Sequence, residues 1–263
     1  MKSWLTDPYG GASGHSREAL GRWGVGPLPY ALKLIHALVV IIAAVFAPRF
    51  SALAQTGPGP SEVARYSGLH AAAFKGDLAQ IKRLVDASPQ SALHAVDGNG
   101  RTPVHVATFA RQRDAIRELA KAGANLELLD KDRYDAVTIA AVADDEETLR
   151  VLLSLSASAK LTTSIYDGTA LIASAHLGHD GIVKQLIAAG APLDHVNNLH
   201  WTALIEAIVL GQGGPRHRET VRALLAAGAN TQLSDRQGRT PLQLAKARGY
   251  DEMLQLLEKA GAK

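Results

Sequence analysis

Apolar residues recur along this chain in blocks of 33 to 38 residues, the first of which begins at residue 67. Within a block, an apolar residue lies fourteen positions after the start and another follows three positions later. This spacing places both side chains on one face of a helix. The pairs are Ile81/Leu84, Ile116/Leu119, Leu149/Leu152, Val183/Leu186 and Leu254/Leu257, joined by Val221/Leu224 once five inserted residues are allowed. Each block is therefore predicted to contain a helix with one apolar face.

A second motif opens each block and predicts a further helix ahead of that one. Its strongest copies are residues 101–107 (RTPVHVA) and 239–245 (RTPLQLA). Threonine before proline suits a helix start, because threonine caps free amides and proline is tolerated at the first helical position. The blocks start at residues 67, 102, 135, 169, 202 and 240. A single unit of this kind cannot bury its apolar stripe, whereas stacked neighbours share a continuous core.

Turn signals connect the units. A Gly-Ala pair follows the second helix at residues 123, 190, 228 and 261, where glycine favours helix termination. Asp97, Asp130, Asn197 and Asp235 each lie five residues before a block start and favour a turn into the next unit. These co-registered features resemble the ankyrin repeat over residues 67–263. The resemblance implies an all-α solenoid of about six helix-turn-helix units with short β-turn fingers.

The resemblance also implies binding of another protein through the turn tips and the exposed face of the first helices, which together form a concave surface. The residues mapped to this surface are Arg101, Tyr134, Tyr166, Leu199, Trp201, Glu206, Arg236 and Arg239. The outward first-helix positions are expected to be Val106, Phe109, Ile139, His176, Glu206 and Arg248. Aromatic and arginine side chains contribute strongly at interfaces. The alternative for the aromatic residues is that each packs flat over its neighbouring turn.

Residues 211–218 (GQGGPRHR) contain the five-residue insertion, between the two helices of the fifth unit. Three glycines and one proline predict a mobile surface loop, and Arg216, His217 and Arg218 make it basic. One interpretation is a tolerated surface insertion. The other is a secondary contact for an acidic partner.

The first 54 residues have the three-part pattern of a secretory signal peptide: a basic segment, the apolar core 37–47, and small residues before a cleavage site near 54/55. Eleven helical residues span roughly 16 Å, about half of the hydrocarbon core of a membrane. No stable membrane span is therefore expected after cleavage, although an uncleaved anchor is the alternative. Residues 55–66 are interpreted as a Pro/Gly linker and N-terminal cap, flexible over residues 55–60.

Charge and cysteine content limit the kinds of binding and catalytic sites that the chain can contain. Five of the 28 basic residues but only two of the 25 acidic residues lie in residues 1–54, which leaves 23 of each in the rest of the chain. A neutral body gives no electrostatic reason to expect nucleic-acid binding. The chain has no cysteine, which excludes disulfides, thiolate metal sites and a cysteine nucleophile.

The histidines are interpreted mainly as structural. The resemblance implies that His70 and His105 bond neighbouring backbone and that His179 has a structural role. His176 and His179 lie three residues apart, a spacing that could serve zinc or copper, but the sequence predicts no further ligand and so no metal site. No nucleophile, base and orienting group occur at meaningful spacing, so neither catalytic residues nor cofactors are expected.

The sequence thus predicts a periplasmic, monomeric, non-enzymatic scaffold that acts on another protein as adaptor, chaperone-like factor or inhibitor. A link to stress defence follows from the resemblance alone. The alternatives are a secreted effector that acts on another cell, and a periplasmic metal- or haem-binding protein.

Overall fold

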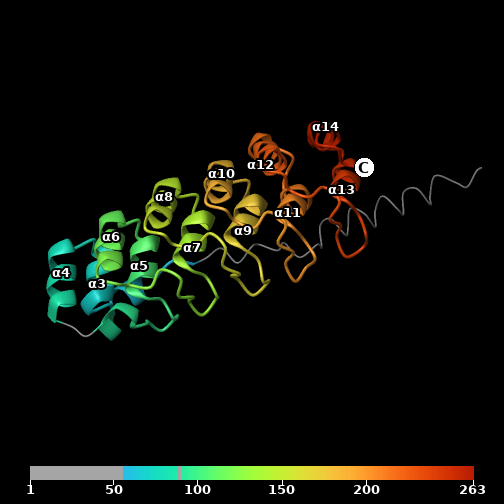
Figure 1. The fold of residues 1–263 in the computed structure, drawn as a ribbon. Helices are drawn as coiled ribbons and strands as arrows, with labels where there is room; N and C mark the ends of the chain where they lie inside the picture. Colours follow the sequence, from blue (N-terminus) through green and yellow to red (C-terminus); the bar gives the residue numbers. More distant parts are fainter. Residues whose placement is uncertain (1–55, 88–89) are drawn as a thin grey trace, which may run out of the picture. The chain divides into compact units, whose positions relative to one another are not determined.

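A computed structural model describes residues 56–87 and 90–263. The predicted signal peptide, its cleavage site and Gln55 lie outside these described residues. Figure 1 shows helix pairs stacked side by side along the described chain, with loops projecting from one row of helices.

The helices alternate between the two rows of Figure 1. The first helices of the units are α3 (Gly68–Lys75), α5 (Pro103–Phe109), α7 (Ala136–Val142), α9 (Ala170–Leu177), α11 (Ala203–Val209) and α13 (Pro241–Arg248). The second helices are α4 (Leu78–Ala87), α6 (Arg113–Lys121), α8 (Glu146–Ser154), α10 (Asp180–Ala188), α12 (Pro215–Ala226) and α14 (Asp251–Lys259). A short α2 (Pro60–Val63) precedes them, and a 3-10 helix (Gln90–His94) follows α4. Within each row, every helix contacts the next one.

The predicted helix-start motif positions the first helices. Thr102, Thr169, Thr202 and Thr240 are the N-caps, and each side-chain oxygen accepts a hydrogen bond from a backbone amide three residues later. In the third unit, Asp135 takes this role and accepts from the Thr138 amide at 2.9 Å. Each cap satisfies an amide that the helix leaves free, so the repeat starts are confirmed as helix starts.

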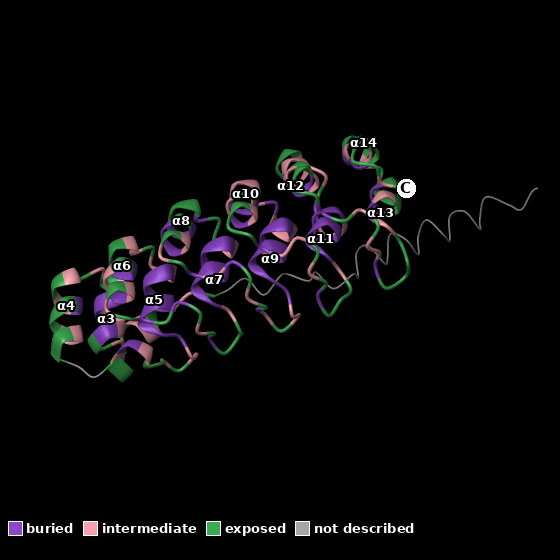
Figure 2. Ribbon diagram, viewed as in Figure 1, coloured by how far each residue is buried: buried purple, intermediate pink, exposed green. Residues whose placement is uncertain are grey.

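The apolar pairs predicted for the second helices form the core in the middle of the stack. Both members of each pair are buried in α6, α8, α10 and α12. Figure 2 shows the buried residues concentrated where neighbouring units face each other. At the ends, Leu84 and Leu254 are only half-buried. Within residues 56–87 and 90–263, no other helix pair packs on the outer face of α4 or α14, so these two helices bury less of their apolar stripe.

The linker expectation needs correction for the residues that the structure describes. Residues 56–66 include the helix α2 and pack on the finger before α5, so they are an ordered part of the fold. Across residues 56–87 and 90–263, no helix is long and apolar enough to cross a membrane.

Candidate functional site

The loops between a second helix and the next first helix, here called fingers, are built on the predicted turn residues. The fingers are residues 95–102, 122–135, 155–169, 189–202 and 227–240. In four of them, the Oδ1 atom of Asp97, Asp130, Asn197 or Asp235 accepts hydrogen bonds from the amides two and four residues later, at 2.8–3.0 Å. These bonds close each finger into a tight turn.

Neighbouring fingers are joined by backbone hydrogen bonds near their tips. The bonds run from Lys131 N to Asn99 O (3.0 Å), from Ser164 N to Arg133 O (2.9 Å) and from Asn198 N to Tyr166 O (2.9 Å). The guanidinium of Arg236 continues the series by donating to Asn198 O at 2.7 Å. The fingers of the second to sixth units therefore form one connected surface.

Exposed apolar side chains gather on this surface. Every large hydrophobic residue that is exposed in the described part of the chain lies in a finger: Val96, Leu129, Ile165, Val196 and Leu199. Exposed apolar patches on a soluble protein mark interaction sites. Leu199 was predicted to belong to the site, whereas Val96, Leu129 and Val196 were not. Their signal was an apolar residue directly before the turn-forming Asp or Asn.

The three aromatic residues assigned to the site are half-buried. Burial raises the pKa of the Tyr134 hydroxyl, and the charges of Asp132 and Asp130 raise it further. Trp201 packs against the hydrophobic core. Trp201 thus combines a packing contact with a partly exposed surface, and Tyr134 and Tyr166 are also partly exposed.

Two residues assigned to the exposed partner-binding surface are buried instead of exposed. Arg101 is 6% exposed because residues 56–62 cover it, and Glu206 is 4% exposed. Glu206 accepts from Asn197 Nδ2 at 3.0 Å and lies 3.3 Å from His176 Nδ1. Val106 and Ile139 are also buried. Like Glu206, both residues lie four positions after a unit start, where the first helices of adjacent units pack against each other.

Arg236 and Arg239, at the C-terminal end of the finger surface, are exposed as expected. Arg239 forms an ion pair with Asp235 at 2.7 Å, yet the Arg239 side chain is 52% exposed. Burial acts to raise the pKa of Asp235, but the hydrogen bonds from Arg239 outweigh it and hold the pKa below its ordinary value.

The loop predicted for residues 211–218 is confined to residues 211–214, because α12 begins at Pro215. Arg216, His217 and Arg218 lie in the first turn of α12, which is three residues longer than α10. Arg216 pairs with Asp144 and Asp180, and Arg218 with Glu252 at 3.0 Å. His217 Nε2 lies 2.9 Å from the carbonyl of His176. These basic groups are engaged within the chain.

The structural roles expected for three histidines are confirmed. Nε2 of His70 contacts the Arg101 carbonyl at 2.8 Å, and Nε2 of His105 contacts the Tyr134 carbonyl at 3.0 Å. Nδ1 of His179 contacts the Ala141 carbonyl at 2.9 Å. Each bond links adjacent units. Residues 56–87 and 90–263 contain no group of three side chains able to hold a metal ion.

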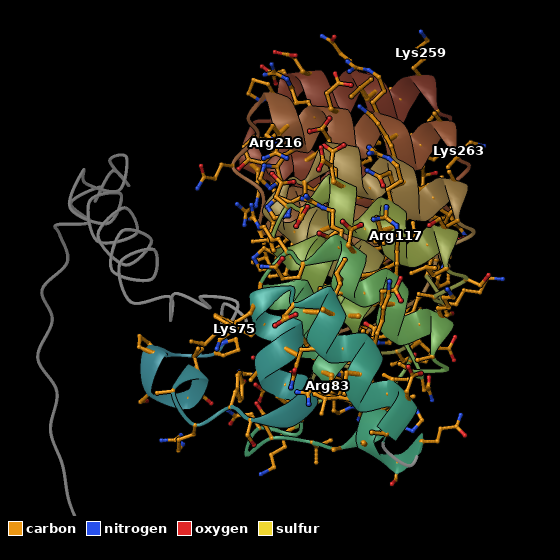
Figure 3. The ribbon with its side chains drawn as sticks, turned by 90° about the vertical axis from the view of Figure 1, so that its left-hand side faces the viewer. Lys75, Arg83, Arg117, Arg216, Lys259 and Lys263 are labelled. Atoms are coloured by element: carbon orange, nitrogen blue, oxygen red, sulfur yellow. The ribbon has the colours of Figure 1, made fainter. Side chains whose placement is uncertain are left out.

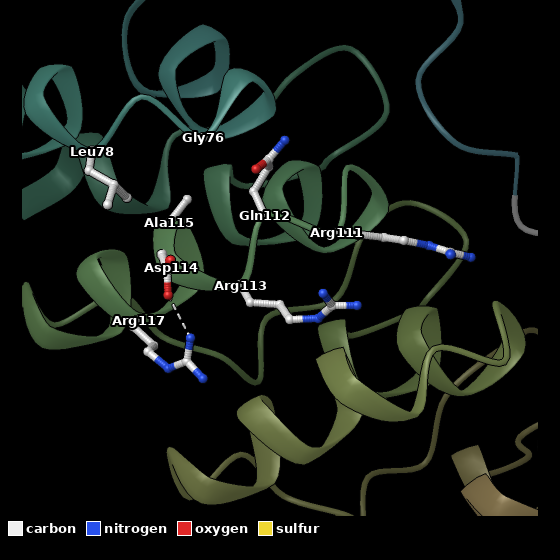
Figure 4. A pocket seen from close by; sticks show the side chains of 8 residues that line it. All are labelled: Gly76, Leu78, Arg111, Gln112, Arg113, Asp114, Ala115 and Arg117. Carbon is white, nitrogen blue, oxygen red and sulfur yellow. Dashed lines mark hydrogen bonds and ion pairs between the residues drawn. The ribbon is translucent and has the colours of Figure 1, made fainter.

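A depression of about 360 Å³ beside α6 lies apart from all of these residues. Figure 4 shows its lining, where Arg117 points to Asp114 at 2.7 Å. Arg111 and Arg113 in the same lining pair with Asp145. The charged side chains of the lining thus form ion pairs within the chain.

The comparisons with known proteins agree with this architecture. The family model described as "Ankyrin repeats (3 copies)" matches residues 69–164 and 156–235. The ankyrin repeat protein YahD of Escherichia coli K12 is 33% identical over 192 residues, which cover 73% of this chain and 94% of YahD.

Two solved structures extend the likeness. An ankyrin repeat domain from Acinetobacter baumannii is 42% identical with a TM-score of 0.69, over 74% of this chain and 98% of that one. A second match lies in the complex of the predatory endopeptidase Bd0816 from Bdellovibrio bacteriovorus with the immunity protein Bd3460. It is 25% identical with a TM-score of 0.57, over 74% of this chain and 98% of that one.

Proposed function

We propose that this chain, which belongs to the ankyrin-repeat family, is an exported scaffold that binds another protein through its finger surface. One observation carries the proposal: the exposed large hydrophobic residues of the described chain all lie in the fingers. Outside the fingers, most large apolar side chains of the described helices belong to the core or pack against it.

The finger surface has the composition that interfaces use. Ile165 is 57% exposed and Leu199 is 37% exposed, at the tips of adjacent fingers. The half-buried Tyr166 and Trp201 lie in the same two fingers. Burial of apolar and aromatic side chains at the centre of an interface supplies most of its binding energy. Arg236 and Arg239 add positive charge at one end, which would favour a partner with acidic groups there.

Among the possible roles we favour inhibition of a partner protein in the periplasm. The predicted signal peptide supports export, and the likeness to a chain of an endopeptidase–immunity protein complex supports an inhibitory role. A link to stress defence, which the family resemblance implies, is also part of this proposal. We expect a monomer that needs no cofactor.

The test is an affinity capture from periplasmic extract, with the full chain as bait. Ile165→Ser combined with Leu199→Ser should abolish capture of a specific protein, because it removes the apolar side chains at the fingertips. The matched control is Arg83→Ser with Arg117→Ser, two exposed residues of α4 and α6 away from the fingers (Figure 3). Capture that survives the fingertip variant would overturn the proposal.

A further inference from the structure

The chain's own N-terminal segment lies on the part of the second unit that the family resemblance assigns to partner binding. The Thr56 carbonyl accepts a hydrogen bond from Arg101 Nη2 at 2.6 Å. Glu62 accepts one from the side chain of Asn99, and its Oε1 lies 3.6 Å from Arg101 Nη1. Asn99 lies at a finger tip, and Arg101 directly precedes a unit start. Phe109 is one of the outward positions of a first helix. A segment that has no helix over residues 56–59 and continues as α2 from Pro60 therefore already occupies this site.

The far end of the segment is held by a partly buried hydrogen bond. The Tyr66 hydroxyl donates to Asp97 Oδ2 at 2.8 Å. Burial and this bond raise the pKa of Tyr66 to about 12, although the charge of Arg101 opposes the shift. Asp97 is also the residue that closes the finger through its Oδ1 atom. The segment is thus anchored at Tyr66, whereas residues 56–62 make the contacts to Arg101.

The equivalent arginine of the sixth unit shows what the segment covers. Arg101 and Arg239 both directly precede the Thr-Pro of their units. The Arg239 side chain is 52% exposed, whereas that of Arg101 is 7% exposed. Removal of residues 56–62 would therefore present a guanidinium at the finger surface of the second unit.

The bound segment satisfies Arg101 poorly. Within residues 56–87 and 90–263, neither Nε nor Nη1 of Arg101 has a hydrogen-bond acceptor, although both atoms are buried. Buried donors without acceptors are unfavourable. A neutral carbonyl, that of Thr56, occupies the position in front of Nη2. A carboxylate there could accept two parallel bonds from the planar guanidinium, which are stronger than bonds to a neutral oxygen.

Phe109 provides an apolar floor beside this cation. The Arg101 guanidinium lies 5.1 Å from the centre of its ring, a cation–π contact. A Cβ atom at Gly57 would lie 3.2 Å from Phe109 Cδ1, so the backbone of the segment approaches the ring closely. The site therefore suits a small, extended stretch of peptide next to a negative group.

We propose that Arg101 and Phe109 form a binding site for an acidic extended peptide, and that residues 56–62 are its built-in competitor. This proposal rests on the proposed function, because it names the chemistry of the partner segment and how access to it is controlled. The partner presents a carboxylate that bonds Arg101 more completely than the Thr56 carbonyl does, and it displaces the segment.

The probe is a fluorescent synthetic peptide of residues 56–66 (TGPGPSEVARY), supplied in trans to the full chain. Gly57→Val with Glu62→Gln is the releasing variant, because it crowds Phe109 and removes the charge facing Arg101. Glutamine can still accept the Gly59 amide bond that Glu62 accepts at 2.8 Å. The control is Ser61→Ala, an exposed residue of the same segment. The releasing variant should bind the peptide at least about tenfold more tightly than the wild type, whose site is filled.

The peptide and the arginine are then varied to test the chemistry. Binding to the releasing variant should fall by about tenfold when the peptide glutamate is replaced by glutamine, since the lost bond is charge-assisted. It should disappear when Arg101→Ala is added. Equal binding by the wild type and a folded releasing variant, or binding that survives Arg101→Ala, would overturn the proposal and leave the segment as a structural cap.

A measurement on the wild-type chain guards against a releasing variant that fails to fold. An excess of peptide in which the arginine is replaced by glutamine, so that trypsin does not cleave it, should raise the rate of trypsin cleavage after the exposed Arg65 of the chain severalfold, because displacement frees the backbone around it. An unchanged rate would contradict the displacement. The proposed function fails on a different result, namely capture that survives Ile165→Ser with Leu199→Ser, so the two failures are distinguishable.

Discussion

Arg216 forms an ion pair with Asp144, which lies 72 positions earlier in the chain, and the Nη2–Oδ2 distance is 2.9 Å. The same guanidinium approaches Asp180 Oδ1 with its Nε atom at 3.3 Å. Asp144 follows α7, Asp180 begins α10 and Arg216 lies in α12, so one side chain links the third, fourth and fifth units. Figure 3 shows Arg216 among other charged side chains along one edge of the stack.

Arg216→Met should lower the free energy of unfolding by about 0.5–1 kcal/mol, the scale of solvent-exposed ion pairs. The arginine side chain is 51% exposed, so the loss should shrink in about 1 M salt. Urea denaturation at low and high salt measures both effects. Arg222→Met is the control, because the partner of Arg222 is Glu219 in the same helix. Equal losses for the two variants would show that the link between units adds nothing.

The third unit is predicted to be the least stable of the stack. It has Asp135-Ala136 in place of Thr-Pro and Ser156 in place of glycine. Hydrogen exchange should show less protection in α7 and α8 than in α5 and α6. Arg216→Met should raise exchange further in α7 and α8, because the pair to Asp144 is lost. Maximal protection in the third unit would contradict this ranking.

Asp145 should contribute stability that depends on pH. Burial acts to raise its pKa, but hydrogen bonds from Thr148 and Arg113 outweigh burial and hold the pKa below its ordinary value. A lowered folded pKa stabilises the protein above the ordinary aspartate value, and the stabilisation is lost as pH falls through the folded value. Asp145→Asn should therefore cost about 1–2 kcal/mol at pH 7. The difference from wild type should vanish well below about pH 4. Denaturation across this range measures it, and a constant difference would refute the assignment.

Gly178 and Gly249 allow a matched test of backbone strain against crowding. Both end a first helix, with φ of +69° and +67°. Alanine at Gly249 would meet open space, so Gly249→Ala should cost about 1–2 kcal/mol from the left-handed backbone alone. At Gly178, the added Cβ would lie 2.8 Å from the His217 ring. Gly178→Ala should cost about 1 kcal/mol more, since the ring must move. Thermal unfolding of both variants measures the difference. An equal loss of unfolding free energy would mean that the His217 ring can move aside without a measurable penalty.

Trp201 and Leu199 should separate stability from binding. Trp201 packs against the core, so Trp201→Ala should destabilise the chain by about 2–3 kcal/mol, less than for a fully buried tryptophan. Leu199 is exposed at the fingertip, and Leu199→Ser should change stability by no more than about 0.5 kcal/mol. Partner capture should nevertheless weaken with Leu199→Ser. Melting temperatures and capture yields on the same preparations test both, and a Leu199→Ser chain that captures normally would remove Leu199 from the site.

The sequence by itself determined the repeat fold, because the signals that specify each unit are local. A threonine cap at Thr102 or Thr240, an apolar pair such as Ile116 and Leu119, and a turn-forming Asp97 each act within a few residues of their own position. Repetition at a nearly constant spacing then requires that the units stack. The family resemblance implied structural roles for His105 and His179, and the structure showed that both contact a carbonyl of an adjacent unit.

Tertiary structure alone decided which residues of the candidate site a partner can reach. Glu206 and Arg101 occupy positions that a single unit would leave open. A neighbouring first helix covers Glu206, and a segment about forty residues earlier covers Arg101. The ion pairs of the basic insertion could not be predicted for the same reason, since the carboxylates that pair with Arg216 lie in two other units. Exposure and charge pairing depend on contacts between distant parts of the chain, and no local pattern encodes them.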